Sequence, residues 1–273
     1  MAHVNAYAAV FWRTLLAGLL GLAIALTRGK LSLPELRAHA RGIVLGGALL
    51  GAHFVLWVKA FELTDYASNL LLLVAQPLIA AVLGTRLGES LPRHATVALA
   101  LAGAGMLLIG GGDYAMGPRA LLGDAMCILA GGFITLFYVA ARDARNALPL
   151  DAFMGSTMMA ASLVALPSAL VAGVPLSGFS LASWAWIAAI VLLTTLAGHG
   201  LLNLAARFVS LFTVNLVIVL EPVIAIAMGA LLFGARITLL QCVGGTLLGG
   251  AVLVGMRQPS SGNTGPPIAV ASG

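Results

Sequence analysis

Charged residues are scarce in this sequence. They make up only 8% of 273 residues, whereas apolar residues make up 61%. So little polar surface cannot cover a water-soluble globule, which excludes that class and indicates an integral membrane protein. The sequence also lacks the alternation of apolar and polar residues that marks a membrane β-barrel. Its apolar stretches of about 20 residues therefore predict an all-α fold, because a helix satisfies its own backbone polar groups.

Cysteines and clustered basic residues are rare as well. Cys127 and Cys242 lie in separate apolar stretches without a C-x-x-C or Cys/His spacing. Neither a disulfide framework nor a metal site is therefore expected, and both are interpreted as buried small apolar residues. The net charge of +5 comes from basic residues scattered singly, which argues against nucleic acid as a partner. No cofactor is expected either.

Nine apolar stretches predict nine membrane-spanning helices in a polytopic bundle, with the lipid bilayer as its surroundings. After the first stretch, Pro34 and Glu35 suit the first turn of a short interfacial helix. Residues 258–273 are rich in proline, glycine and serine and predict a disordered tail. The expected spans are residues 6–27, 42–63, 66–87, 95–112, 120–141, 152–173, 183–204, 209–232 and 237–256.

Most basic residues fall on one side of this nine-span arrangement. By the positive-inside rule that side is expected to be cytoplasmic, with the C-terminus inside, the N-terminus outside and the bacterial inner membrane as the location. Ten of the 14 basic residues lie there: Arg28, Lys30, Arg37, Arg41, Arg86, Arg93, Arg142, Arg145, Arg207 and Arg257.

The outer ends of the spans carry few cations and several aromatic residues. We interpret Trp12, Tyr114, Trp184 and Trp186 as an interfacial aromatic belt. A group of charged residues, Lys59, Glu62 and Asp65, crowds one outer end and is interpreted as solvated. The remaining cations are Arg13, Arg119 and Arg236.

The sequence repeats itself at an offset of 145 residues. An odd number of spans separates equivalent helices, so the two copies would cross the membrane in opposite directions, as in secondary transporters. The expected units are residues 1–113, with four helices, and 114–257, with five. The matching pairs are Pro77 and Pro222, Ala80 and Ala225, Gly84 and Gly229, Leu87 and Leu232, Gly105 and Gly250, Gly110 and Gly255, with His53 and His199 offset by 146.

Two sets of motifs resemble the repeats of the EamA-type family in the drug/metabolite transporter superfamily. The first is H-F-x-x-W-x-x-A-F-x-x-T-x-x-A-S from His53 to Ser68, followed by Gln76-Pro77 and by Leu87-Gly88-Glu89. The second is Gly198-His199 with Asn203, then Glu221-Pro222-Val223 and a glycine-rich last helix from Gly244 to Gly255.

This resemblance covers almost the whole chain. It implies ten helices in two inverted five-helix repeats, cytoplasmic termini, and export of amino acids or other small metabolites. The sequence departs from the family pattern in two places. The family's first helix is missing before residue 6, and the second repeat ends at Leu232-Phe233-Gly234-Ala235 without the glutamate that Glu89 supplies in the first.

Glu221 is the strongest candidate for chemistry because it falls near the middle of its span. An ionised carboxylate there costs about 2 to 3 kcal/mol on insertion scales, so it should face a cavity or a partner. It could carry a proton or bind a substrate ammonium group, or it could be a protonated residue that only fixes helix packing. Pro222 and Pro77 each remove a backbone donor one turn back, which predicts a pair of helix kinks.

Four further polar or aromatic residues pair at helical spacing. His53 and Trp57 are four residues apart, as are His199 and Asn203, so each pair shares a helix face. Both faces could line a central cavity, or the histidines could simply hydrogen-bond between helices. Gln76 is the counterpart of Glu221 in the first repeat. Only the second repeat would therefore place a charged residue at the centre of the bundle.

Arg13 lies in the outer half of the first span. It could snorkel to the outer headgroups, or it could attract a substrate carboxylate. Glycines in two spans suit close helix packing or a homodimer face; these are Gly103, Gly105, Gly245, Gly249 and Gly250.

The preferred function is a secondary transporter that exports small metabolites by alternating access, either proton-linked or facilitative. The missing first helix favours an alternative, a non-transporting membrane subunit or a lipid-handling protein. An intramembrane hydrolase is a remote alternative, because Ser156 and His199 both lie in spans. The residues around Ser156 lack the G-x-S-G context of membrane serine proteases, so no enzymatic activity is expected.

Overall fold

The computed structural model describes residues 4–73, 75–88, 94–114, 117–218, 220–234 and 237–255. Some helical positions are described by their backbone alone, Glu221 and Pro222 among them. The predicted tail at 258–273, together with Glu89, Arg93, Arg236 and Arg257, lies outside the described residues. Within the described ranges the secondary structure is entirely helical, which confirms the all-α prediction.

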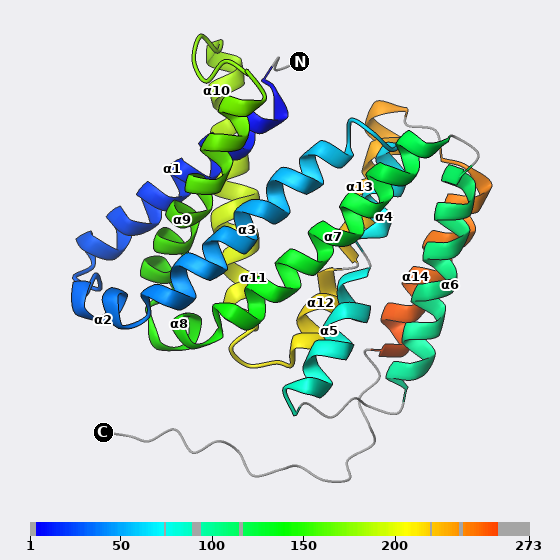
Figure 1. The fold of residues 1–273 in the computed structure, drawn as a ribbon, viewed down its shortest axis with the longest axis horizontal. Coiled ribbons are helices and arrows are strands. Elements are labelled where there is room, and N and C mark those ends of the chain that lie inside the picture. The colour runs from blue at the N-terminus through cyan, green and yellow to red at the C-terminus, as the bar shows by residue number, and fades with distance from the viewer. Residues whose placement is uncertain are drawn as a thin grey trace.

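Each of the nine predicted spans is present as a helix or as consecutive helical segments (Figure 1). Six helical stretches of the described chain are long and apolar enough to cross a membrane, and α6 and α14 add shorter apolar helices. The elements are α1 (Ala6–Thr27), α2 (Leu33–Ala38), α3 (Ala40–Ala60), α4 (Tyr66–Leu72), α5 (Ala75–Arg86), α6 (Ala95–Tyr114), α7 (Pro118–Ala140), α8 (Arg142–Ala147), α9 (Leu150–Val171), α10 (Leu181–Ala189), η1 (Ile190–His199), α11 (Gly200–Ala205), α12 (Leu211–Ile218), α13 (Leu220–Phe233) and α14 (Leu239–Gly255).

Local sequence explains how the first span ends and the interfacial helix begins. Gly29 adopts a left-handed conformation with φ of 65°, and Lys30 N–H reaches back to the Ala25 carbonyl at 2.8 Å, which closes α1. The short helix α2 follows as predicted. Ser32 caps it by accepting a hydrogen bond from Glu35 N–H at 3.5 Å, with a proline in the first turn.

Two spans are each described as two helical segments at equivalent positions of the repeat. In the first repeat α4 ends at Leu72, Leu73 lies in a turn and α5 begins at Ala75; in the second, α12 ends at Ile218 and α13 begins at Leu220. The residues at positions 74 and 219, between these segments, lie outside the described residues, so the kinks expected at Pro77 and Pro222 stay predictions. Each proline is the third residue of the segment that carries it.

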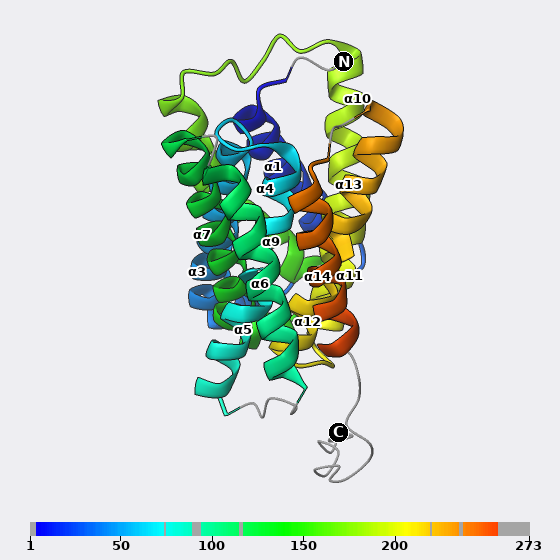
Figure 2. The same cartoon turned by 90° about the vertical axis from the view of Figure 1, so that its right-hand side faces the viewer.

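Equivalent helices of the two repeats pack directly against each other. Helix α1 lies along α9, and α6 lies along α14 (Figures 1 and 2). A Cβ built on Gly21 would lie 2.8 Å from the Cα of Gly155, and one built on Gly105 would lie 2.8 Å from the carbonyl oxygen of Gly244. Only glycine permits such backbone approach. Gly103 and Gly249, in contrast, face open space rather than a helix contact.

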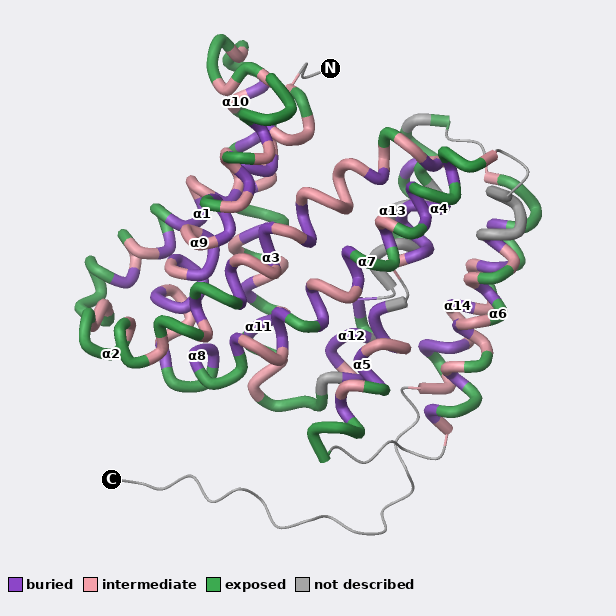
Figure 3. Tube along the Cα trace, in the orientation of Figure 1, coloured by how far each residue is buried: buried purple, intermediate pink, exposed green. Residues whose placement is uncertain are grey.

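The outer surface of the bundle is apolar, as a lipid-facing surface requires. Exposed residues are distributed along the helices (Figure 3), and many of them are large and apolar, such as Leu107, Leu163, Leu231 and Leu253. Cys127 is buried as expected, but Cys242 is exposed on the outer face of α14, so its predicted burial is wrong. The cause is its position on a helix of which only one side meets the core.

Described basic residues gather at one end of the bundle. Helices α2 and α8 and the connection from α11 to α12 lie at this end (Figure 1), and we call it the basic end. It carries Arg28, Lys30, Arg37, Arg41, Arg86, Arg142, Arg145 and Arg207. At the opposite end Trp12 and Trp184 pack edge to face, with ring centroids 5.0 Å apart, and Trp12 Nε1 donates to the Leu176 carbonyl at 2.8 Å.

The contact between α1 and α9 gives a stability prediction. Gly155→Ala would place a Cβ 2.5 Å from the backbone nitrogen of Leu22, so the two helices must separate. We expect a loss of about 1 to 3 kcal/mol, measured as a lower unfolding temperature in detergent. Gly249→Ala is the matched control because nothing lies within 4 Å of its added Cβ. Equal unfolding temperatures for the two variants would contradict this account of the contact.

Candidate functional site

The predicted histidine of the first repeat is a buried residue that joins two helices. His53, on α3, is only 4% exposed, and its Nδ1 donates to the backbone carbonyl of Ala130 on α7 at 2.8 Å. A carbonyl only accepts hydrogen bonds, so the proton sits on Nδ1 and Nε2 is left as an acceptor. Trp57 lies one turn further along α3, its ring parallel to that of His53 at 6.2 Å between centroids.

Arg13, on α1, and His199, on η1, both contact Phe54 on α3. The Arg13 guanidinium lies 4.2 Å from the centre of the Phe54 ring, and its Nε donates to Thr195 Oγ1 on η1 at 3.3 Å. His199 meets the other side of this contact, edge-on to the Phe54 ring at 5.4 Å. Arg13 therefore points across the bundle from α1, and the interpretation that it snorkels to the headgroups is wrong. We call Arg13, His53, Phe54, Trp57, His199 and Asn203 the aromatic–cation cluster.

Asn203 completes this cluster from α11. It is fully buried, and its Nδ2 donates to the carbonyl of His199 at 2.9 Å and approaches Met154 Sδ on α9 at 3.5 Å. Both interactions use the amide nitrogen Nδ2, so the side-chain oxygen Oδ1 takes part in neither.

Gln76 occupies the second residue of α5 and is 2% exposed. A Cβ added to Gly131 on α7 would lie 3.2 Å from Gln76 Cγ, so the glutamine packs directly on that glycine. His53 bonds the preceding residue, Ala130. His53 and Gln76 therefore contact the same turn of α7. Glu221 occupies the corresponding second residue of α13, and its side chain lies outside the described residues.

Four of these predicted residues carry a buried polar atom that has no hydrogen-bond partner among the described residues. The atoms are Trp57 Nε1, Gln76 Oε1, His199 Nδ1 and Asn203 Oδ1. Buried polar atoms in native proteins are nearly always paired, so four exceptions on three spans need an explanation. In membrane proteins such atoms face a substrate, an ion or water rather than lipid.

An irregular helix holds His199 of the cluster and Thr195, which bonds Arg13. The segment η1 is a π-helix, in which the Thr195 hydroxyl donates to the carbonyl of Ile190 five residues earlier at 3.1 Å, and His199 is its last residue. Segments of π-helix are frequent at functional sites. Sequence reasoning missed this feature, and no residue pattern in the span distinguishes it from an ordinary helix.

A second polar cluster, near the end opposite the basic end, was also missed. Thr64 Oγ1 donates to Asp124 Oδ1 on α7 at 2.8 Å, while Asp65 Oδ2 accepts from Ser68 Oγ at 2.8 Å and from Gln241 Nε2 on α14 at 2.8 Å. Asp65 is thus tied to another helix, and its interpretation as a solvated residue is wrong. Asp124 could have been found from the sequence, because it is an acidic residue inside an apolar stretch. Lys59 and Glu62 do form an exposed ion pair, at 2.6 Å.

The serine considered for hydrolysis makes only local contacts. Ser156 Oγ donates to the carbonyls of Ala152 and Phe153, at 2.8 and 3.1 Å, within its own helix. Its hydroxyl proton is therefore committed to the backbone. This arrangement gives no activated nucleophile.

The comparison with known proteins now decides the family. A model described as the EamA-like transporter family matches residues 1–111 and again 121–256. The chain belongs to this family. Its members are transporters, so the resemblance inferred from the motifs is confirmed, and the chain is a multi-pass membrane transporter with one matched segment per repeat.

The solved structures support the same fold. Fifteen chains match. One, described as "Crystal structure of protein", is 17% identical to this EamA-like chain, with a TM-score of 0.71, over 93% of this chain and 88% of its own length. At that identity the likeness shows the fold alone. A search of curated proteins found no match.

The unpaired atoms give a second stability prediction. Gln76→Met keeps the side-chain length and removes an unpaired oxygen, so we expect an unfolding temperature equal to or above that of the unchanged protein. Thr64→Val is the contrast, because it removes the hydroxyl that donates to Asp124 inside the protein and should cost about 1 to 3 kcal/mol. Thermal unfolding in detergent measures both. A clear loss of stability in Gln76→Met would contradict this interpretation.

Proposed function

We propose that the protein is a secondary transporter that exports amino acids or other small metabolites by alternating access. The substrate site is the aromatic–cation cluster together with Gln76 and Glu221. The observation that carries this proposal is the set of unpaired buried atoms on Trp57, Gln76, His199 and Asn203, because a transported solute or its water would supply their missing partners.

The charges of the site suit an amino acid. Arg13 supplies a cation inside the bundle, held against Phe54 and Thr195, and it suits a substrate carboxylate. Glu221 suits the ammonium group, or carries a proton in exchange for it. Trp57 and Phe54 supply aromatic walls. A zwitterion is therefore the substrate class that we propose.

The moving parts follow from the repeat. The equivalent segments α5 and α13 each carry one of these residues, Gln76 or Glu221, as their second residue. In other inverted-repeat transporters the substrate site lies at the interface between the repeats. The glycine contacts between α1 and α9 and between α6 and α14 would let the two repeats move against each other without losing their packing.

We further propose that the protein lies in a bacterial inner membrane with its basic end and C-terminus in the cytoplasm. The eight described basic residues at that end support this orientation through the positive-inside rule.

The role of Arg13 is tested by substrate discrimination. In proteoliposomes we expect counterflow of a radiolabelled amino acid from a panel, and none of its methyl ester, which lacks the carboxylate. Arg13→Gln should reduce apparent affinity for the amino acid by about tenfold and leave little preference over the ester. Ser156→Ala, whose hydroxyl bonds only its own helix, is the control and should transport normally. Unchanged discrimination in Arg13→Gln would rule out this role.

Coupling is tested at Glu221. If its carboxyl group carries the coupled proton, Glu221→Gln should abolish the stimulation of transport by a pH gradient while substrate exchange at equal pH continues. The comparison of gradient-driven uptake with exchange, across a range of pH, measures this. Transport by Glu221→Gln that equals the unchanged protein at every pH excludes a coupling role.

A further inference from the structure

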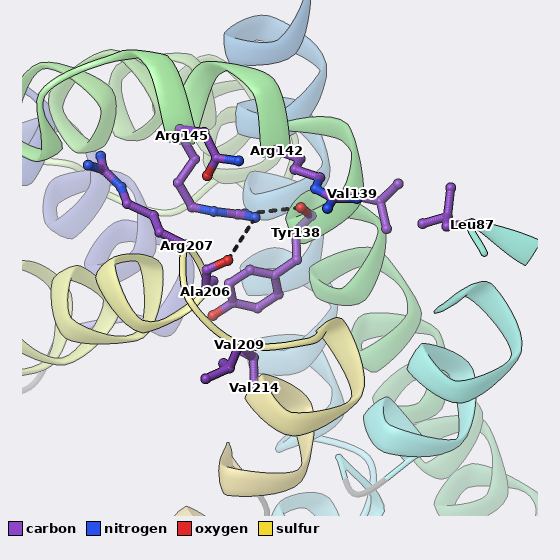
Figure 4. Close-up of a pocket in the computed structure, with 10 residues that line it drawn as sticks. Leu87, Tyr138, Val139, Arg142, Arg145, Ala206, Arg207, Val209 and Val214 are labelled. Carbon is purple, nitrogen blue, oxygen red and sulfur yellow. Dashed lines mark hydrogen bonds between the residues drawn. The ribbon is translucent and has the colours of Figure 1, made fainter. Parts of the chain in front are cut away.

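A second polar site lies at the basic end, away from the aromatic–cation cluster. It is a cavity of about 80 Å³ where the end of α7, α8 and the connection from α11 to α12 meet (Figure 4). Its described lining contains three arginines, Arg142, Arg145 and Arg207, and no aspartate or glutamate. A cavity of this size has room for about five waters, which is enough for a phosphate group.

Arg145 is the buried member of the three, only 4% exposed. Its Nη1 donates to the Tyr138 carbonyl at 3.0 Å, and its Nη2 approaches the Ala206 carbonyl at 3.5 Å (Figure 4). Both partners are neutral, so they orient the guanidinium without balancing its charge. Its Nε is buried and has no hydrogen-bond partner within the described part of the chain.

Arg207 adds a second cation in which one N–H group lacks a hydrogen-bond partner among the described residues. Its Nη2 donates to the Leu148 carbonyl at 2.8 Å, and its buried Nε also lacks a partner among the described residues. Burial above all, with smaller contributions from the charges of Arg142 and Arg207 and against the effect of Tyr138, lowers the pKa of Arg145 to about 10, so it stays protonated at neutral pH. Burial likewise lowers the pKa of Arg207.

Cations gathered in this way are costly unless an anion balances them. A buried charge without a counter-charge is strongly unfavourable, and repulsion between like charges adds to that cost. Basic residues whose only role is to orient the protein in the membrane can stay exposed at the surface and need not share a cavity. Arg37, exposed on α2 at the same end, is an example.

We propose that this cavity binds a phosphate group, with Arg145 as its central donor and Arg142 and Arg207 as flanking cations. Guanidinium groups match phosphate oxygens in geometry and charge, and three positive charges suit a phosphate better than a single carboxylate. The phosphate belongs either to an anionic lipid headgroup at the membrane surface or to a soluble solute. Its binding ties α8 to the connection between α11 and α12.

Thermal unfolding of the purified full-length protein in detergent tests this site. One arm adds inorganic phosphate at constant ionic strength, and the other adds phosphatidylglycerol, with phosphatidylcholine as the uncharged comparison. We expect a saturable rise in unfolding temperature in at least one arm. A response to phosphate identifies a site open to water, and a response to phosphatidylglycerol alone identifies a lipid headgroup site.

Three variants separate the proposed site from general basicity. Arg142→Ala changes an exposed residue, so it should fold normally and bind the effective probe about tenfold more weakly. Arg145→Lys keeps the charge but loses the planar fork and should bind more weakly still. Arg37→Ala removes an equal charge at the same end and should bind like the unchanged protein. No saturable response to either probe, equal binding by Arg142→Ala, or equal weakening in Arg37→Ala would overturn the proposal. This readout is independent of transport.

Discussion

The absence of water in the hydrocarbon core decides how the polar side chains of this bundle are used. Most of them turn to a backbone carbonyl on their own helix, as Thr14 does with Val10 at 2.9 Å and Thr135 with Gly131 at 2.8 Å. Others pair across helices, as Thr64 does with Asp124. Because pairing is the rule, the unpaired atoms of Trp57, Gln76, His199 and Asn203 need an explanation, and the proposed substrate site supplies one.

Close contact between small residues holds this site in place. Glycines let α1 meet α9 and α6 meet α14 at backbone distance, so each repeat packs on its own counterpart. The site lies beside the contact of α1 with α9, with Arg13 from α1, His53 and Trp57 from α3, and His199 from η1. Its members come from both repeats. A relative movement of the repeats would therefore change the site directly.

Sequence reasoning went furthest where periodicity or the repeat carried the information. The apolar stretches located all nine spans. It failed where contact across helices decides the outcome. Three features depend on which helix lies alongside: the direction of Arg13, the exposure of Cys242 and the bonding of Asp65 to Gln241. The sequence of one span does not determine how its helix is rotated against its neighbours. The π-helix carries no local signature.

The most direct test of the account is whether Asn203 faces an aqueous path used by the substrate. A single cysteine at this position, Asn203→Cys, in a protein whose two native cysteines are replaced by serine, would be treated with a membrane-impermeant maleimide in proteoliposomes. The account predicts labelling that a transported amino acid slows. A cysteine at Ser156 serves as the comparison and should react slowly with or without substrate. Equal, substrate-independent reaction at both positions would contradict the account.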